Sequence, residues 1–115
     1  MTGYPLPTGA ACVALTADGL AVARAIAGLL PQAEVHGLAE RTSGADVNFI
    51  DTGDHLRRLF TEGRPIIAVM AAGILIRVLS PLLSDKANEP PVLAVAADGG
   101  VVVPLLGGHN GANRL

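Results

Sequence analysis

The sequence predicts a three-layer α/β domain, with a mostly parallel sheet, helices on both faces and a β-hairpin near the C-terminus. Short runs rich in Val, Ile and Ala alternate with segments whose apolar residues recur at helical spacing. This alternation is typical of buried parallel strands joined by helices. The segment 90–106 differs, because two apolar runs flank Asp98-Gly99-Gly100, which favours a hairpin turn.

In the first half of the chain we expect a strand at 10–16, a helix at 20–30, a strand at 33–38 and a loop at 39–46. The first strand is an apolar run between Gly9 and Asp18. The first helix repeats apolar residues three and four positions apart. Thr16 or Asp18 can cap its start, and Pro31 ends it.

In the second half we expect a helix at 54–62, a strand at 65–70, a helix at 71–79 and the hairpin at 90–106. Leu56, Leu59 and Phe60 form one face of the helix at 54–62. Ser80-Pro81 indicates a new helical turn, because proline is tolerated at a helix start. After the hairpin, residues 107–115 read as a loop that enters the first turn of another helix.

Composition narrows the class of protein. The chain has 115 residues, which suits a single domain, 1–115, with its own core. The formal net charge is −2 and no basic patch stands out, so we expect no nucleic-acid partner. Cys12 is the single cysteine and lies in an apolar run, so an internal disulfide is impossible and a buried, unreactive thiol is expected.

Neither a signal peptide nor a membrane span is indicated. The first ten residues lack a basic segment followed by a long apolar one. The most apolar stretch, 65–83, is interrupted by Arg77 and Pro81, whereas a spanning helix needs about 20 apolar residues. We therefore expect a cytoplasmic protein with no membrane partner.

The predicted fold suggests where a ligand would bind. In open α/β sheets, ligands lie beyond the carboxyl ends of the strands. Two glycine-bearing loops follow apolar strands, one at 71–73 and one at 107–111. We expect them to face the same edge of the sheet and to form one site.

Several residues in or near these loops have two interpretations. Gly73 either lets a ligand approach free backbone N–H groups or only permits a tight strand-to-helix turn. Arg77 either binds a carboxylate through two guanidinium hydrogen bonds or is a solvated helix residue. Lys86, the only lysine, either attracts an acidic ligand or pairs with Asp85.

The last loop contains the candidate catalytic groups. His109, between glycines at 108 and 111, is a candidate general acid or base, or an isolated loop histidine. Asn113 would hold a substrate oxygen or cap a helix. His36 and His55 lack metal-ligand spacing with His109 or with Cys12, so we expect no protein metal site.

The second half of the chain, from about residue 65, resembles the amino-terminal domain of the CbiG family, the cobalt-precorrin-5A hydrolases of cobalamin biosynthesis. The matching motifs, in order, are Ala72-Gly73, Arg77, Pro81, Asp85-Lys86, Glu89-Pro90, Asp98-Gly99, Gly108-His109 and Gly111-Ala112-Asn113. Two positions depart from the family pattern. Ala72 replaces the usual threonine, and the last loop carries Asn110 and one glycine fewer.

The resemblance implies hydrolysis of a polycarboxylate tetrapyrrole that carries cobalt. Water would open a ring-A δ-lactone, and a two-carbon fragment would leave as acetaldehyde. The cobalt belongs to the substrate, so no cofactor is expected. The implied catalytic residues are His109 and Asn113, and the implied substrate-binding residues are Ala72, Gly73, Arg77, Lys86, Gly108 and Gly111, with Arg77 and Lys86 holding peripheral carboxylates.

The resemblance also concerns chain length and partners. Family members continue beyond this point, and related domains resemble those fused to precorrin methyltransferases, so we expect a fragment of a longer chain. The alternative to the hydrolase is a non-catalytic corrinoid-binding domain, attached to or associated with a methyltransferase. A homodimer is a candidate assembly. A phosphate-binding or nucleotide-binding domain is disfavoured, because no phosphate-binding fingerprint is present.

Overall fold

The computed structural model describes residues 7–83, 89–98, 100 and 102–106. These residues form one six-stranded sheet with the strand order β3-β2-β1-β4-β5-β6. The strands are β1 (Ala11–Ala14), β2 (Glu34–Leu38), β3 (Val47–Phe49), β4 (Ile66–Val69), β5 (Val92–Val95) and β6 (Val102–Leu106). Neighbouring strands from β3 to β5 pair in parallel, and β6 pairs antiparallel with β5. The predicted fold class is therefore confirmed, including the hairpin.

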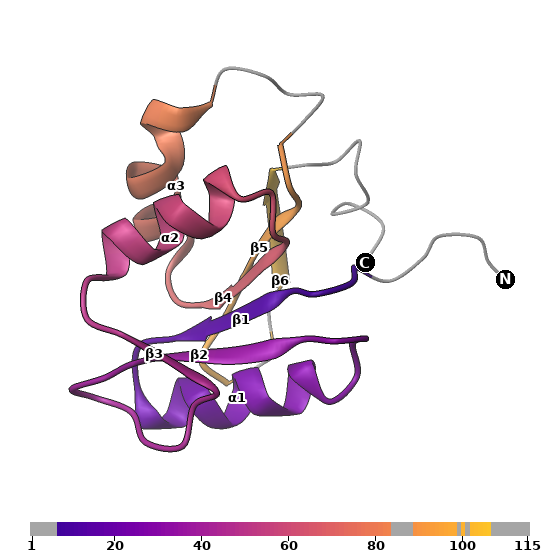
Figure 1. The fold of residues 1–115 in the computed structure, drawn as a ribbon, viewed down its shortest axis with the longest axis vertical. Helices are drawn as coiled ribbons and strands as arrows, with labels where there is room; N and C mark the ends of the chain where they lie inside the picture. Colours follow the sequence, from indigo (N-terminus) through magenta and orange to yellow (C-terminus); the bar gives the residue numbers. More distant parts are fainter. Residues whose placement is uncertain (1–6, 84–88, 99, 101, 107–115) are drawn as a thin grey trace, which may run out of the picture.

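Helices cover both faces of the sheet (Figure 1). Helix α1 (Ala17–Ala27) packs on one face, whereas α2 (Thr52–Thr61) and α3 (Ala72–Leu79) pack side by side on the other. The 3-10 turn η1 (Ser80–Leu82) follows α3 directly and contains Pro81, as expected from the sequence. The result is a three-layer arrangement.

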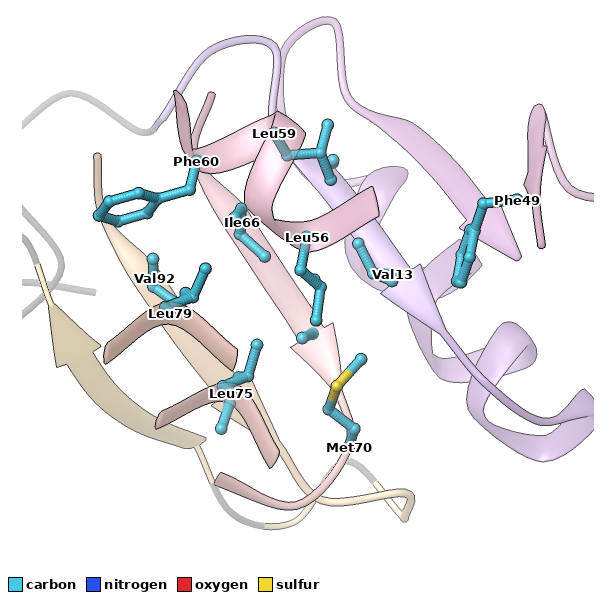
Figure 2. Close-up of a cluster of buried hydrophobic side chains, with 13 residues drawn as sticks. Val13, Phe49, Leu56, Leu59, Phe60, Ile66, Met70, Leu75, Leu79 and Val92 are labelled. Carbon is cyan, nitrogen blue, oxygen red and sulfur yellow. The ribbon is translucent and has the colours of Figure 1, made fainter. Parts of the chain in front are cut away.

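The two faces have cores of different composition. On the face of α2 and α3, large side chains such as Leu56 and Leu75 pack against Val13, Ile66 and Val92 of the sheet (Figure 2). On the face of α1 the buried residues are mostly smaller, including Ala14, Ala23 and Cys12. The strands alternate residues between these faces, which explains why their runs are apolar throughout.

Element boundaries differ from the expected ones at two helices. Helix α1 ends at Ala27, three residues before the predicted end at 30. Helix α2 begins at Thr52, because the carboxylate of Asp51 accepts a hydrogen bond from the backbone N–H of Asp54, at 2.9 Å, and so caps the first turn. Strand β3 was not expected, since it has three residues and lies at the sheet edge.

The thiol of Cys12 is buried between α1 and the sheet, and burial raises its pKa to about 11. A thiol with this pKa is almost entirely protonated at neutral pH, so the expected unreactive cysteine is confirmed. In the part of the chain that the structure describes, no helix is long and apolar enough to cross a membrane.

Candidate functional site

The order of strands reverses between β1 and β4, and the region beyond the carboxyl ends of these two strands is called the crevice by its topology. From β1 the chain continues outward to β2 through α1, and from β4 it continues the other way to β5 through α3. These two helices therefore start at neighbouring strand ends but on opposite faces of the sheet. This reversal is where ligands bind in doubly wound sheets.

The α1 side of the crevice is closely packed. The hydroxyl of Thr16 accepts a hydrogen bond from the backbone N–H of Gly19, at 3.0 Å, and caps α1 as predicted. A Cβ atom added to Gly19 would lie 3.1 Å from that hydroxyl oxygen and 3.4 Å from Cγ1 of Val69 at the end of β4. The first turn of α1 therefore sits directly against the end of β4.

The α3 side of the crevice is open. The N-cap residue, Ala71, has no side chain that can accept a hydrogen bond from the first turn. Ala72 is half-buried and packs against the core, whereas Gly73 is exposed. A Cβ atom added to Gly73 would meet no atom of the described residues within 4 Å. The first turn of α3 is thus exposed at Gly73 and has no side-chain cap, and backbone N–H groups at a helix start favour an anion or a developing oxyanion.

Gly73 is not required by the turn itself. The described glycines with positive φ are Gly9, Gly44 and Gly63, and Gly73 is not among them. Neither backbone conformation nor lack of space therefore demands a glycine here. Of the two interpretations of Gly73, the structure disfavours the purely conformational one.

Arg77 lies on the same side of α3 as Gly73. The two residues are four positions apart in one helix, so their side-chain directions coincide. The Arg77 side chain is exposed and forms no ion pair with any described residue. The structure therefore places an available guanidinium group on the exposed face of α3, one turn after Gly73.

The sequence suggested that the two glycine-bearing loops leave the sheet at the same edge. The structure shows that they leave it at opposite edges. Because β6 is antiparallel, Val102 pairs with Val95 and Leu106 pairs with Val92. The chain therefore leaves β6 beside the amino-terminal ends of the parallel strands, opposite the Gly73 turn. Five predicted site residues, Lys86, Gly108, His109, Gly111 and Asn113, lie outside the described residues.

A second cluster of polar side chains, which sequence reasoning missed, connects β2 to α2. Nδ1 of His36 lies 2.7 Å from Nε2 of His55, and Nε2 of His36 lies 3.2 Å from Oε1 of Glu34. Arg64 donates to the same Glu34 oxygen at 3.1 Å and to the carbonyl oxygen of Gly9. The His55 ring also stacks on Phe49, with ring centroids 4.5 Å apart.

Burial explains the ionisation of this cluster. His36 is only 2% exposed, and burial lowers its pKa, although the hydrogen bond with Glu34 opposes this change. Burial also lowers the pKa of His55 to about 4. Hydrogen bonds from His36 and then Arg64 lower the pKa of Glu34. At neutral pH both rings are therefore neutral and Glu34 is charged.

One signal of this cluster was present in the sequence. Glu34 and His36 are two residues apart in a strand and must share a face, but nothing in the spacing indicated His55. His55 lines an open pocket of about 360 Å³ together with β3, Asp51, Asp54 and Arg58. No group of three or more His, Cys, Asp or Glu among the described residues could hold a metal ion.

Comparison with known proteins gives this geometry a context. Residues 54–115 match the family described as Cobalamin synthesis G N-terminal. Over 113 residues the chain is 36% identical to the cobalt-precorrin-5A hydrolase of Salmonella typhimurium, covering 95% of this chain and 31% of that protein. The protein of the same name from Priestia megaterium is 29% identical over 112 residues, covering 91% of this chain and 30% of its own length.

The fold has a counterpart among solved structures. The crystal structure of a cobalamin biosynthesis protein G homologue from Sulfolobus solfataricus matches 94% of this chain and 32% of that chain, with a TM-score of 0.65 and 21% sequence identity. That likeness concerns the fold. The chain spans less than a third of the length of both curated relatives. Because the family match covers more than half of the sequence, this chain belongs to the Cobalamin synthesis G N-terminal family.

Proposed function

We propose that this chain is the amino-terminal domain of a cobalt-precorrin-5A hydrolase and takes part in opening the ring-A δ-lactone of that substrate in cobalamin biosynthesis. The observation that carries the proposal is the 36% identity, over 95% of this chain, to a protein of that name. Both curated relatives are named as hydrolases, which favours this function over the corrinoid-binding domain without catalytic activity.

The open side of the crevice suits part of this reaction. When water adds to the lactone carbonyl carbon, negative charge develops on the carbonyl oxygen, and the ring C–O bond then breaks. Backbone N–H groups at the start of α3, uncovered at Gly73, are suitable donors to that oxygen. Arg77 is exposed on the same side and suits a peripheral carboxylate of the tetrapyrrole.

The other assignments in this proposal come from the family motifs. His109 is the candidate acid or base and Asn113 its neighbour at the reacting centre. Lys86, Gly108 and Gly111 are candidate substrate contacts. Cobalt enters as part of the substrate, the domain needs no cofactor of its own, and the setting is the cytoplasm.

The test replaces the matching third of the Salmonella typhimurium hydrolase with this chain and measures acetaldehyde release from cobalt-precorrin-5A. We expect the hybrid enzyme to release acetaldehyde. A folded hybrid that binds the substrate, shown by a shift in its absorbance spectrum, yet releases no acetaldehyde would contradict the proposal and support a binding role.

Arg77 provides a matched pair of variants in the same hybrid. Loss of one charged hydrogen bond costs about 1.5–3 kcal/mol, so Arg77→Ala should lower kcat/KM by about 10-fold to 100-fold. The kcat/KM of Arg77→Lys should fall between those of the unmodified hybrid and Arg77→Ala. Lysine keeps the positive charge but cannot donate two parallel hydrogen bonds to one carboxylate. Arg41→Ala is the control, since Arg41 is also exposed and unpaired among the described residues, but follows β2. Equal effects at Arg77 and Arg41 would remove the assignment.

A further inference from the structure

The contact between His36 and His55 lies apart from the crevice at β1 and β4 and has no part in the proposed reaction. It joins the middle of β2 to the first turn of α2, across the face of the sheet. We propose that this histidine pair is an acid-sensitive contact between β2 and α2, and that protonation of both rings releases the first turn of α2 from β2.

The arrangement of hydrogen bonds defines the tautomer of each ring. The Glu34 carboxylate can only accept, so Nε2 of His36 carries a proton and donates to it. Nδ1 of His36 is then an acceptor, and Nε2 of His55 donates to it. Nδ1 of His55 makes no hydrogen bond with any described residue, and His55 lines the open pocket. The pair in its neutral form is therefore fully compatible with its 2.7 Å separation.

Burial disfavours the first added proton, but that proton leaves the contact between the rings intact, whereas the second does not. A proton on Nδ1 of His55 enters from the pocket and leaves the bond between the rings intact. A further proton must go to Nδ1 of His36, which then faces the N–H group of His55 at 2.7 Å with no lone pair between them. Two like charges and two opposed donors at this distance are strongly repulsive, so the rings must separate.

The charged groups around the pair do not remove this repulsion. Glu34 and Asp46 favour the charged form of His36, whereas Arg64 disfavours it. Arg58 of α2 and Arg64 both disfavour the charged form of His55. Among the described residues, Glu34 is the carboxylate that contacts the pair, and it already accepts from His36 and Arg64 through the same oxygen.

Release should stop after the first turn of α2. Leu56, the residue after His55, is completely buried in the core, and Leu59 and Phe60 follow it there. The part of α2 that precedes its core residues, and that the pair joins to β2, is therefore Thr52 to His55. The carbonyl groups of Thr52 to His55 accept the helical hydrogen bonds of the amides of residues 56–59. The amide of His55 itself donates to the carbonyl oxygen of Asp51. These amides report the release.

The experiment is amide hydrogen exchange by NMR on this chain between pH 7 and pH 5, corrected for the intrinsic pH dependence of exchange. With an ordinary histidine pKa of about 6.5 in the released state and a pKa of about 4 for His55 in the closed state, protonation of His55 alone should favour the released state about 20-fold more at pH 5 than at pH 7. Protection at 55–59 should fall by about that factor, while amides of α1, on the face without histidine, keep theirs. Equal loss in α1 and α2 would overturn the proposal, because it indicates unfolding of the whole domain.

Two further measurements keep the outcome decisive. His55→Gln preserves a donor toward His36 and cannot be protonated, so the loss of protection should shrink several-fold. The control is Arg57→Gln, on the same helix, whose guanidinium group pairs with Asp54 and not with the rings. If His55→Gln does not fold, the ring titrations of the unmodified chain decide. Rings that titrate near pH 6.5 with unchanged exchange at 55–59 would show that only the side chains move, and would refute the release.

Discussion

Gly73→Ala should make the domain more stable and the hybrid enzyme less active. The backbone of Gly73 does not have positive φ, and an added Cβ would meet no atom within 4 Å in the part of the chain that the structure describes. Alanine therefore fits without strain, and the loss of backbone freedom in the unfolded chain should raise the free energy of unfolding by about 0.4–1 kcal/mol. The same methyl group would project from the exposed first turn of α3, beside its N–H groups, and would hinder a ligand that approaches them. If these N–H groups stabilise the oxyanion, the variant should lose about 1.4 kcal/mol of transition-state stabilisation, which lowers kcat/KM about tenfold.

Gly28→Ala is the matched control. Gly28 has φ −65° and ψ −16° at the end of α1, and its added Cβ would lie 3.5 Å from the nearest atom, in ordinary contact. It should stabilise the domain by a similar amount without changing activity. Urea denaturation of this chain measures stability, and acetaldehyde release by the hybrid enzyme measures activity. The reasoning fails if Gly73→Ala is destabilising, or if it leaves kcat/KM equal to that of Gly28→Ala.

Four other predictions follow from the same geometry. Thr16→Ala removes the cap of α1 and should cost about 1 kcal/mol in urea denaturation. Leu56→Ala leaves a cavity under α2 and should cost about 2–5 kcal/mol, with the midpoint of thermal unfolding as the measurement. The pKa of His55 is lower in the folded chain, at about 4, than when unfolded, so stability is complete above about pH 6.5 and declines toward pH 4. That loss should be about 2 kcal/mol in denaturation curves taken across this range, after allowance for the ring's partial exposure. Finally, Gly73→Ala and His109→Ala should be combined in the hybrid enzyme, because non-additive effects on kcat/KM would place the two residues in one site and additive effects would separate them.

Periodicity predicted the layers of this domain because the helices and the buried strands each have their own pattern. Leu56, Leu59 and Phe60 mark a helix face, and that face is buried. The strands at Ala11 and Ile66 are apolar throughout because both faces are covered, and this also indicated their parallel pairing. Such features depend on residues close in sequence, so sequence reasoning could find them.

The remaining features depend on residues far apart in sequence. Strand β3 is defined by pairing of Val47 with His36 at the sheet edge, and its three residues have no periodicity of their own. The approach of His55 to His36 likewise results from how α2 crosses the sheet. The expectation that the two glycine loops leave the sheet at the same edge was wrong for a related reason. A hairpin was correctly predicted, but a hairpin reverses direction, so the end of β6 belongs to the opposite edge from the end of β4.

Helix α2 connects the histidine pair to the crevice, and its packing indicates that the two remain energetically separate at mildly acidic pH. Opening of the first turn at His55 reaches the core only if Leu56 is also exposed, which costs about 2 kcal/mol. Leu56 shares its cluster with Leu75 of α3, so an intact Leu56 keeps α3 and the Gly73 turn in place. Protonation of the pair should therefore alter exchange at α2 without changing the effect of Gly73→Ala on activity. The effect of Gly73→Ala on activity could instead disappear as the histidines become charged. That result would mean that α2 and α3 move together, and that the core between them opens before the first turn of α2 is released.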